Sequence, residues 1–286
     1  LLAALERLPR ARAIAAAIGL PLLGLGGLVV LVVANATSTP TPDPCAEIER
    51  ELAGVWDAPR RDALARAFAA PELADAGASA ELVAAGLDRW ATGWLVERER
   101  VCRASDQQRI APPLAAAESA CLARQQRKVA RLVETLSETL DADAVAGAIE
   151  AVDALASAAS CGDPIDAGLP PPEPGQAAKV DALRDELGQA WDLRMLGRVE
   201  RGRERVEALH AQAEAIGYGP LLAEVAAERA YAELAAGSMA SGRALLNEAI
   251  DLAERHRHER LLAELWTSAA LLGFSTADDE AAAAWA

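Results

Sequence analysis

The sequence has few aromatic residues, few histidines and none of the common catalytic motifs. Aromatic residues make up 3% of the 286 residues, and histidine occurs three times. A Ser-His-Asp pattern, an HExxH helix and a Walker A loop are all missing. His256 and His258 would point about 200° apart on a helix, so they cannot share one metal ion there. We expect no catalytic, cofactor-binding or metal-binding residue in this chain, and we interpret these histidines and His210 as surface residues.

β-Branched residues are also scarce, whereas hydrophobic residues, mostly Ala and Leu, make up 52% of the chain. Ala and Leu are strong helix formers, and strands favour the β-branched and aromatic residues that are rare here. The predicted fold class is therefore all-α.

Basic residues are outnumbered, with 28 Lys and Arg against 43 Asp and Glu and a net charge of −15. Residues 1–34 hold three Arg and one Glu, which leaves the rest of the chain with a net charge of −17. Nucleic-acid binding needs a basic stripe that displaces phosphate counterions, and the sequence has none. We expect no nucleic-acid partner, and electrostatic repulsion disfavours acidic substrates.

One long uncharged segment is present, the 22 residues at 13–34. At about 1.5 Å of rise per residue, a helix of this length crosses a hydrocarbon core of roughly 30 Å. Arg7, Arg10 and Arg12 precede the segment, whereas residues 35–44 contain no Lys or Arg. By the positive-inside rule, we expect residues 1–12 in the cytoplasm and the chain after the transmembrane helix in an extracytoplasmic, periplasmic location.

Two other interpretations of this segment stay open. A signal peptide could be cleaved at Ala34-Asn35-Ala36, although its apolar part is usually only about 7–15 residues long. A buried core helix is rarely free of charge over such a length. Because the chain begins with Leu1 rather than Met, we expect it to be a fragment whose missing N-terminal part is cytoplasmic.

Proline-rich segments divide the remaining chain. Alternating prolines at 35–44 predict an extended, Pro/Thr-rich stalk, because proline prevents helix formation there. A second Pro-rich stretch at 168–176 predicts a stiff linker. These segments separate a cysteine-bearing helical domain at 45–167 from a repeat region at 177–286.

The cysteine-bearing domain is expected to contain four or five helices. Breaks are predicted near Pro71, at Pro112 and before Asp141, which can cap a new helix. Trp90 and Trp94 stand four residues apart on one face of a helix that begins near Ser79, and we interpret them as core residues. The same stripe is extended by Leu82, Val83, Leu87 and Val101.

The four cysteines, Cys45, Cys102, Cys121 and Cys161, all follow the predicted transmembrane helix, where an oxidising compartment favours disulfides. None lies in a CxxC pair, which disfavours a zinc site, and reduced structural thiols stay as the alternative. Cys45 starts a helix at about Ala46, and Cys102 ends the helix through Trp90. Cys121 opens a helix, and Cys161 closes the following one. If each pair of helices is antiparallel, the predicted disulfides are Cys45–Cys102 and Cys121–Cys161.

The chain repeats itself beyond Ala177, because Gly197 and Gly202 recur at Gly237 and Gly242 with an offset of 40 residues. The repeat predicts helical hairpins similar to tetratricopeptide (TPR) repeats, whose usual period is about 34 residues. A solenoid of such hairpins commonly binds a protein or peptide on its concave face. The predicted helices are Val180–Leu196, Val199–Ile216, Pro220–Ala236 and Met239–His256, followed by a third unit that starts near Glu259 and turns at Gly273.

Several short motifs follow one another in an order that is similar to one family. They are Pro44-Cys45, Gly54-Val55-Trp56-Asp57, Leu87-Asp88-Arg89-Trp90, Ala120-Cys121-Leu122 and Gly217-Tyr218-Gly219-Pro220-Leu221. With the Arg-flanked span and the stalk, the chain resembles the C-terminal half of large myxobacterial-type serine/threonine protein kinases. The resemblance implies an upstream cytoplasmic kinase domain that binds ATP and Mg²⁺. The HRD and DFG motifs of that domain do not occur here.

The leading functional interpretation is a membrane-anchored sensory and protein-binding region of such a kinase. A protein or peptide bound to the repeats, or a second copy of the chain in a homo-oligomer, would change the association of the kinase domains. The alternative is a stand-alone, membrane-anchored TPR-like scaffold for envelope proteins. A hydrolase built from acidic residues such as Asp57, Asp88 and Asp106 is the least favoured interpretation.

Overall fold

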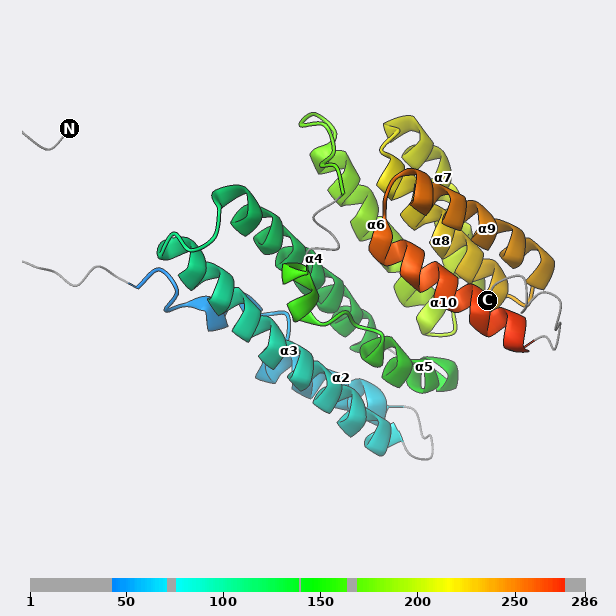
Figure 1. Cartoon of the computed structure of the whole chain (residues 1–286). Helices are drawn as coiled ribbons and strands as arrows, with labels where there is room; N and C mark the ends of the chain where they lie inside the picture. Colours follow the sequence, from blue (N-terminus) through cyan, green and yellow to red (C-terminus); the bar gives the residue numbers. More distant parts are fainter. Residues whose placement is uncertain (1–42, 71–75, 139, 164–168, 276–286) are drawn as a thin grey trace, which may run out of the picture. The chain divides into compact units, whose positions relative to one another are not determined.

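The computed structural model describes residues 43–70, 76–138, 140–163 and 169–275 (Figure 1). The chain divides into two units, Leu1–Ala46 and Glu47–Ala286, and the description below concerns the second unit and the described residues just before it. The cytoplasmic segment 1–12, the transmembrane segment 13–34 and nearly all of the stalk at 35–44 lie outside the described residues, so their predictions remain predictions.

The all-α prediction is confirmed, since the described residues form helices and no strand. The first part of the unit contains the 3₁₀ turns η1 (Ile48–Leu52) and η2 (Ala158–Gly162) and the helices α2 (Ala58–Ala69), α3 (Ala76–Asp106), α4 (Pro112–Leu136) and α5 (Ala142–Asp153). The second part contains α6 (Ala177–Met195), α7 (Val199–Ile216), α8 (Gly219–Ala235), α9 (Met239–Arg255) and α10 (Glu259–Ser275).

Helix starts in the first part follow the capping signals in the sequence. The Asp57 carboxylate accepts a hydrogen bond from the Arg60 backbone N–H at 3.0 Å, and Asp141 accepts one from the Ala144 backbone N–H at 2.9 Å. Pro112 occupies the first turn of α4, where no backbone N–H is needed. The predicted cap at Asp141 and the predicted break at Pro112 are therefore confirmed.

Two details of the predicted helices are wrong. The helix expected from about Ala46 is only the short 3₁₀ turn η1, because Gly54 then adopts a positive φ of 77° and Asp57 starts α2. Leu82 was expected on the buried stripe of α3 but is 58% exposed. Val83, three residues before Gly86 on the α5-facing side of α3, is buried instead.

The two tryptophans of α3 lie in the core, as predicted. Trp94 is 1% exposed, and its indole N–H donates a hydrogen bond to the Leu122 carbonyl of α4 at 3.0 Å. Trp90 is also buried, and the centroids of the two rings are 6.4 Å apart. The hydrogen bond to Leu122 gives the buried indole N–H of Trp94 the partner that it would otherwise lack.

All four cysteines are disulfide-bonded, and Cys121 is bonded to Cys161 as predicted. Cys45 and Cys102 are likewise oxidised. The predicted positions of these two cysteines at helix ends are wrong, because Cys121 lies in the middle of α4 and Cys161 lies in the turn η2. The bond therefore fixes η2 against the middle of α4.

The helices of the second part form consecutive hairpins, α6 with α7 and α8 with α9, followed by α10. Their bounds agree with the predicted bounds to within a few residues. Both hairpins turn at a glycine with a left-handed backbone, Gly197 at φ 75° and Gly237 at φ 79°. Only glycine adopts this conformation without strain, which explains why the sequence signal recurs after 40 residues.

The second pair of glycines allows close packing within each hairpin. A methyl group at Gly202 would lie 3.0 Å from the Ala190 carbonyl oxygen, and one at Gly242 would lie 2.6 Å from the Leu234 side chain.

The predicted turn at Gly273 is wrong, because α10 continues through that residue to Ser275. The part of the chain that would complete a third hairpin lies outside the described residues.

One described segment, Ala142–Gly162, is long and apolar enough to cross a membrane by length and composition. It is not the predicted span. It consists of α5 and η2 with an irregular stretch between them, and α5 alone covers only about 18 Å at 1.5 Å per residue. Ala148 and Ala151 of α5 are fully buried in the folded unit.

Candidate functional site

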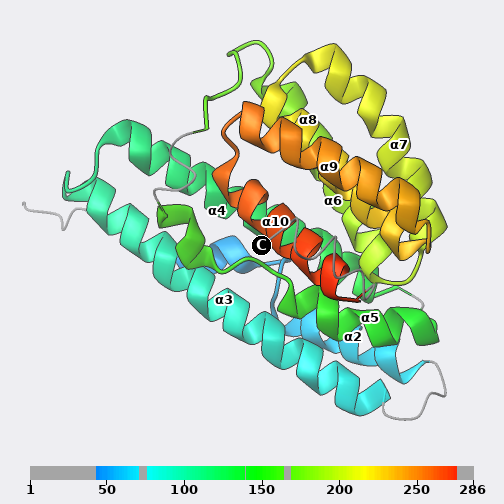
Figure 2. The same ribbon diagram turned by 45° about the vertical axis from the view of Figure 1, so that its right-hand side comes forward.

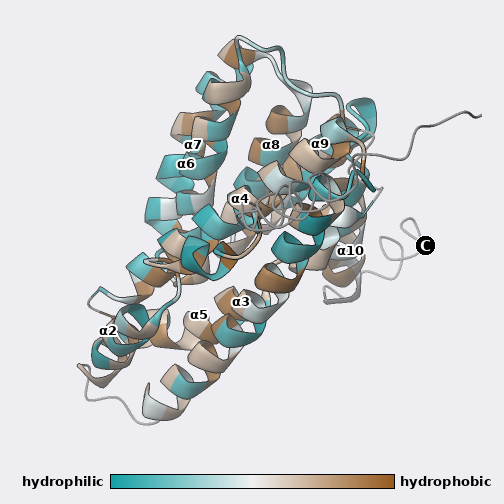
Figure 3. Cartoon of the chain, turned by 90° about the vertical axis from the view of Figure 1, so that its left-hand side faces the viewer, coloured by the Kyte–Doolittle hydropathy of each residue, from teal (hydrophilic) through white to brown (hydrophobic). Residues whose placement is uncertain are grey.

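The two parts of the folded unit meet along helix α4, which has faces of opposite character. One face is fully buried in the first part and consists of Leu122, Val129, Leu132, Val133 and Leu136. The other face carries Arg124, Arg127, Lys128 and Arg131, which recur at helical spacing and lie toward the hairpins. Figure 3 shows hydrophilic and hydrophobic segments alternating along the helices. We call the contact between this cationic face and the hairpins the seam.

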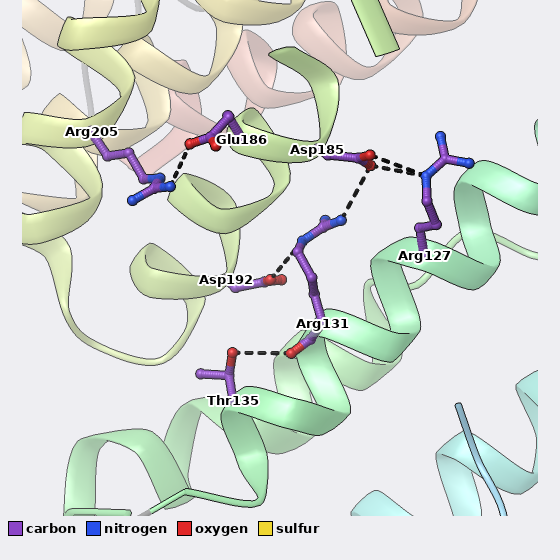
Figure 4. A network of polar contacts seen from close by, with 7 residues as sticks. All are labelled: Arg127, Arg131, Thr135, Asp185, Glu186, Asp192 and Arg205. Carbon is purple, nitrogen blue, oxygen red and sulfur yellow. Dashed lines mark hydrogen bonds and ion pairs between the residues drawn. The ribbon is translucent and has the colours of Figure 1, made fainter. Parts of the chain in front are cut away.

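Ion pairs link α4 to α6 across the seam (Figure 4). The Arg127 Nε atom lies 3.1 Å from Asp185 Oδ2, and the Arg131 Nη1 atom lies 3.5 Å from Asp185 Oδ1. Arg131 also reaches Asp192, with 3.4 Å between Nε and Oδ2. Gly188, between these two aspartates, leaves room for the Arg131 guanidinium, since a methyl group at Gly188 would overlap it.

A cation–π contact lies next to these ion pairs. The Lys128 ammonium nitrogen is 3.6 Å from the centroid of the Trp191 ring on α6. Burial lowers the pKa of Lys128, while the nearby carboxylates of Asp192 and Glu228 oppose this shift. An aromatic face partly replaces the water that the ammonium loses, so the contact stabilises a desolvated cation.

Asp192 is the most strongly buried acid of the seam, at 3% exposure. Burial raises the pKa of this carboxyl to about 6, although Arg131 and Lys128 favour the charged form. Its Oδ1 atom is buried and has no hydrogen-bond partner among the described residues. The seam therefore holds a carboxylate whose charge is only partly compensated.

Further ion pairs connect the hairpins to one another. Arg184 of α6 donates two hydrogen bonds to Glu224 of α8, at 2.8 and 2.6 Å. His258, before α10, places its Nε2 atom 3.4 Å from Glu224 Oε1. Burial alone would raise the pKa of Glu224, but Arg184 and His258 outweigh burial and lower it to about 2.

A second pair of this kind follows along the same helices. Arg194 donates two hydrogen bonds to Glu228, at 2.7 and 3.1 Å, and its guanidinium carbon lies 5.4 Å from the centroid of the Tyr231 ring. Helix α10, which Figure 2 shows beside α9, also reaches the first part, because Arg260 donates a hydrogen bond to the Ser160 carbonyl at 3.2 Å. Charged side chains thus connect α6 with α8, and α10 with η2.

A cavity of about 700 Å³ opens at one end of the seam, among α4, α5, α6 and α7. Its lining is charged: Arg201 and Arg205 come from α7 and Arg198 directly precedes that helix, whereas Glu134 and Glu138 come from the end of α4 and the turn after it, near Arg131 of α4. A smaller cavity of about 410 Å³ adjoins it between α6 and α7 and shares Arg201 and Arg205 with it. Cavities of this size accommodate small ligands.

Two of the three acidic residues considered for hydrolysis, Asp57 and Asp88, have structural partners, and Asp106 is exposed at the end of α3. Asp57 caps α2, while Asp88 accepts a hydrogen bond from the Trp56 indole N–H at 2.8 Å and pairs with Arg61. The described residues contain no group of three or more His, Cys, Asp and Glu that could hold a metal ion.

The interpretation of the histidines as surface residues is wrong for His258, whose side chain is 12% exposed and contacts Glu224. The ring of His256 packs over Gly219, where a methyl group would lie 2.1 Å from its Nδ1 atom. His210, with a 24% exposed side chain, lies 3.6 Å from Glu214.

Sequence reasoning named none of the seam residues. The available signal was the cationic stripe of α4 opposite its apolar stripe, because a helix whose polar face is uniformly basic often pairs with an acidic surface. Comparisons with models of protein families, with curated proteins and with solved structures found no match.

Proposed function

We propose that this chain is the membrane-anchored, extracytoplasmic sensory and protein-binding region of a serine/threonine protein kinase. In this proposal the hairpins α6 to α10 act as TPR-like repeats that take up a protein or peptide signal. The cysteine-bearing helices transmit the signal toward the membrane, and the catalytic domain lies upstream. Disulfide bonds support an oxidising location of the folded unit, since they persist mainly outside the cytoplasm.

The observation that carries the proposal is the polar character of the seam. A purely apolar interface in the same place would hold the two parts in one fixed arrangement. Here Lys128 contacts Trp191, and Arg131 reaches Asp185 and Asp192, so much of the contact is made by groups that water can also solvate. Such an interface can rearrange at a lower cost in free energy than a purely apolar one, because separated charges regain their hydration.

This arrangement suggests how a signal could pass along the chain. A partner that binds the hairpins and draws Arg194 away from Glu228 would change the electrostatic field around Lys128, because Glu228 is one of the carboxylates that act on the Lys128 ammonium group. A weaker contact between Lys128 and Trp191 would then let α4 shift relative to α6. Through the Cys121–Cys161 bond, a shift of α4 reaches η2 and the helices packed on it.

The location can be tested on intact cells that express the full-length protein. After mild reduction, a membrane-impermeant thiol reagent is expected to label the four cysteines as fully as it does in lysed cells. Labelling only after lysis would contradict the proposed topology. Sequencing upstream of Leu1 then separates the two functional interpretations: a kinase domain with HRD and DFG motifs supports the sensory role, whereas an initiator Met close to Leu1 supports the stand-alone scaffold.

Signal transmission can be tested in the same full-length protein. We expect Lys128→Glu, which places a carboxylate against Asp192 and Glu228, to change autophosphorylation by breaking the seam. Arg66→Glu, a charge reversal at an exposed position of α2, is the control and should leave autophosphorylation unchanged. Equal activity of all three proteins would contradict transmission through the seam.

A further inference from the structure

The cavity among α4, α5, α6 and α7 combines charged groups in a way that the seam does not need for its own stability. Arg201 makes no ion pair with any described residue, and the same holds for Glu134 and Glu138 on the opposite wall. The net charge of the whole chain is −15, yet three guanidiniums gather on one wall of this cavity. Such a concentration of arginines attracts an anionic group.

The three arginines are arranged to act together. Arg201 and Arg205 are four residues apart at the start of α7, so their side chains share one face of that helix, and Arg198 is the residue directly before it. Arg198 lies 3.3 Å from Asp141, and Arg205 pairs with Glu186, which holds both side chains at the edges of the cavity (Figure 4 for Arg205). Arg201 lies between them, and its guanidinium donors are not used in an ion pair with any described residue.

The opposite side of the cavity favours a positive group. Glu134 and Glu138 line it, together with Arg131 and Asp192. Arg131 pairs with Oδ2 of Asp192, but Asp192 has a side chain only 4% exposed, and its Oδ1 atom has no hydrogen-bond partner among the described residues. A buried carboxylate oxygen without a donor is unfavourable, so a ligand that supplies an N–H group there would be stabilised. An anion alone would leave this side unsatisfied.

Apolar side chains complete the cavity between the two charged walls. Leu140, Ala144 and Leu196 line it and are each buried from solvent at 5% exposure or less. We propose that the cavity binds a free α-amino acid with an apolar side chain. Its carboxylate pairs with Arg201 and its neighbours, its ammonium group pairs with the acidic wall, and its side chain lies against Leu140 and Leu196.

This site goes beyond the proposed function, because it concerns a small molecule and does not require a kinase domain or a particular topology. Binding is therefore measured on the 286-residue chain purified in detergent. Isothermal titration calorimetry with free leucine, valine, alanine and glutamate, each up to about 10 mM, would reveal even a site with a millimolar Kd. We expect leucine or valine to bind and glutamate to bind more weakly or not at all.

Two chemical derivatives test the zwitterion directly. N-acetyl-leucine lacks the ammonium group, and leucinamide lacks the carboxylate, so each should bind at least about tenfold more weakly than leucine. If N-acetyl-leucine binds as tightly as leucine, the cavity is a simple anion site and the proposal is wrong. Absence of binding by all the free amino acids would also refute it.

Matched variants on the same helix locate the site. Arg201→Ala should raise the Kd for leucine by about tenfold or more, because a charged hydrogen bond is lost. Arg203→Ala is the control, since Arg203 pairs with Glu200 and Glu233 and does not line the cavity. Equal weakening by both substitutions would place binding elsewhere. Arg201 is exposed, so its variant is expected to fold, and its melting temperature without ligand verifies this.

Discussion

Arg184 and Glu224 lie 40 residues apart in the sequence, which is the period of the hairpins, and their side chains form a two-pronged ion pair. Arg184 therefore joins α6, the first helix of one hairpin, to the equivalent position in α8, the first helix of the next hairpin. His258, at the entrance to α10, contacts the same carboxylate. One glutamate thus connects three successive units of the repeat, and the hairpins depend on it for their relative positions.

Removal of this carboxylate should destabilise the protein. Glu224→Gln leaves the Arg184 guanidinium largely buried without its partner, which costs about 2–4 kcal/mol of unfolding free energy. Urea denaturation at neutral pH measures this loss. The exposed pair Arg50–Glu47 gives the control, since Glu47→Gln should change the stability very little. Equal effects of the two substitutions would contradict a structural role for Glu224.

The same residue predicts a loss of stability in acid. Its pKa falls from 4.5 in a free side chain to about 2 in the folded protein, so the folded state binds fewer protons between these values. The contribution of Glu224 is complete above pH 4.5 and disappears as the pH falls through about 2. The stability difference between the native protein and Glu224→Gln should shrink over this range, and a constant difference would contradict it.

Asp192 predicts the opposite dependence on pH. Its pKa rises from 3.8 to about 6, mainly through burial, so the folded state binds more protons than the unfolded state between these values. Stability should therefore decrease by about 3 kcal/mol in total as the pH rises from below 3.8 to above about 6. Asp192→Asn should abolish this decrease. Urea denaturation at several pH values measures it, and an unchanged slope in the variant would show that another group is responsible.

The sequence predicted those features of the fold that depend on neighbouring residues. Asp141 caps a helix wherever its side chain reaches the backbone N–H three residues later, and Gly197 and Gly237 allow a left-handed turn that other residues resist. These are local effects, so the bounds of α7 were predicted correctly. The error at Gly273 has the same origin, because a glycine within a helix permits a turn but does not require one.

The seam and the cavity could not be predicted in this way, because they depend on which helix faces meet. The contact between Lys128 and Trp191 joins residues 63 positions apart, and no local pattern relates them. Leu82 shows that a local pattern can also predict burial where there is none. It was assigned to the stripe of Val83 and Leu87, but it lies about 100° around the helix from Val83, on the side of α3 that also carries the exposed Arg89.

The pair Lys128 and Trp191 provides a direct test of the seam. In a double-mutant cycle with Lys128→Met and Trp191→Leu, we expect a coupling energy of about 0.5–2 kcal/mol, because the two side chains form a partly desolvated cation–π contact. Thermal or urea unfolding of the four proteins gives the value. Additive effects of the two substitutions would mean that the contact contributes nothing beyond burial.

Gly147 of α5 offers the sharpest test of how the two parts are packed. A methyl group there would lie 2.1 Å from the Met195 carbonyl oxygen and 3.3 Å from the Leu196 Cα atom, so the backbone at the end of α6 leaves no space for it. Gly147→Ala should therefore cost about 1–3 kcal/mol of unfolding free energy, because a backbone group has to move.

Gly93→Ala in α3 is the matched control, because no heavy atom lies within 4 Å of the added methyl group. Alanine favours helix there by roughly 0.5–1 kcal/mol. Urea denaturation should thus give opposite signs for the two substitutions, and stabilisation by both would mean that α5 and α6 are not in contact at this point.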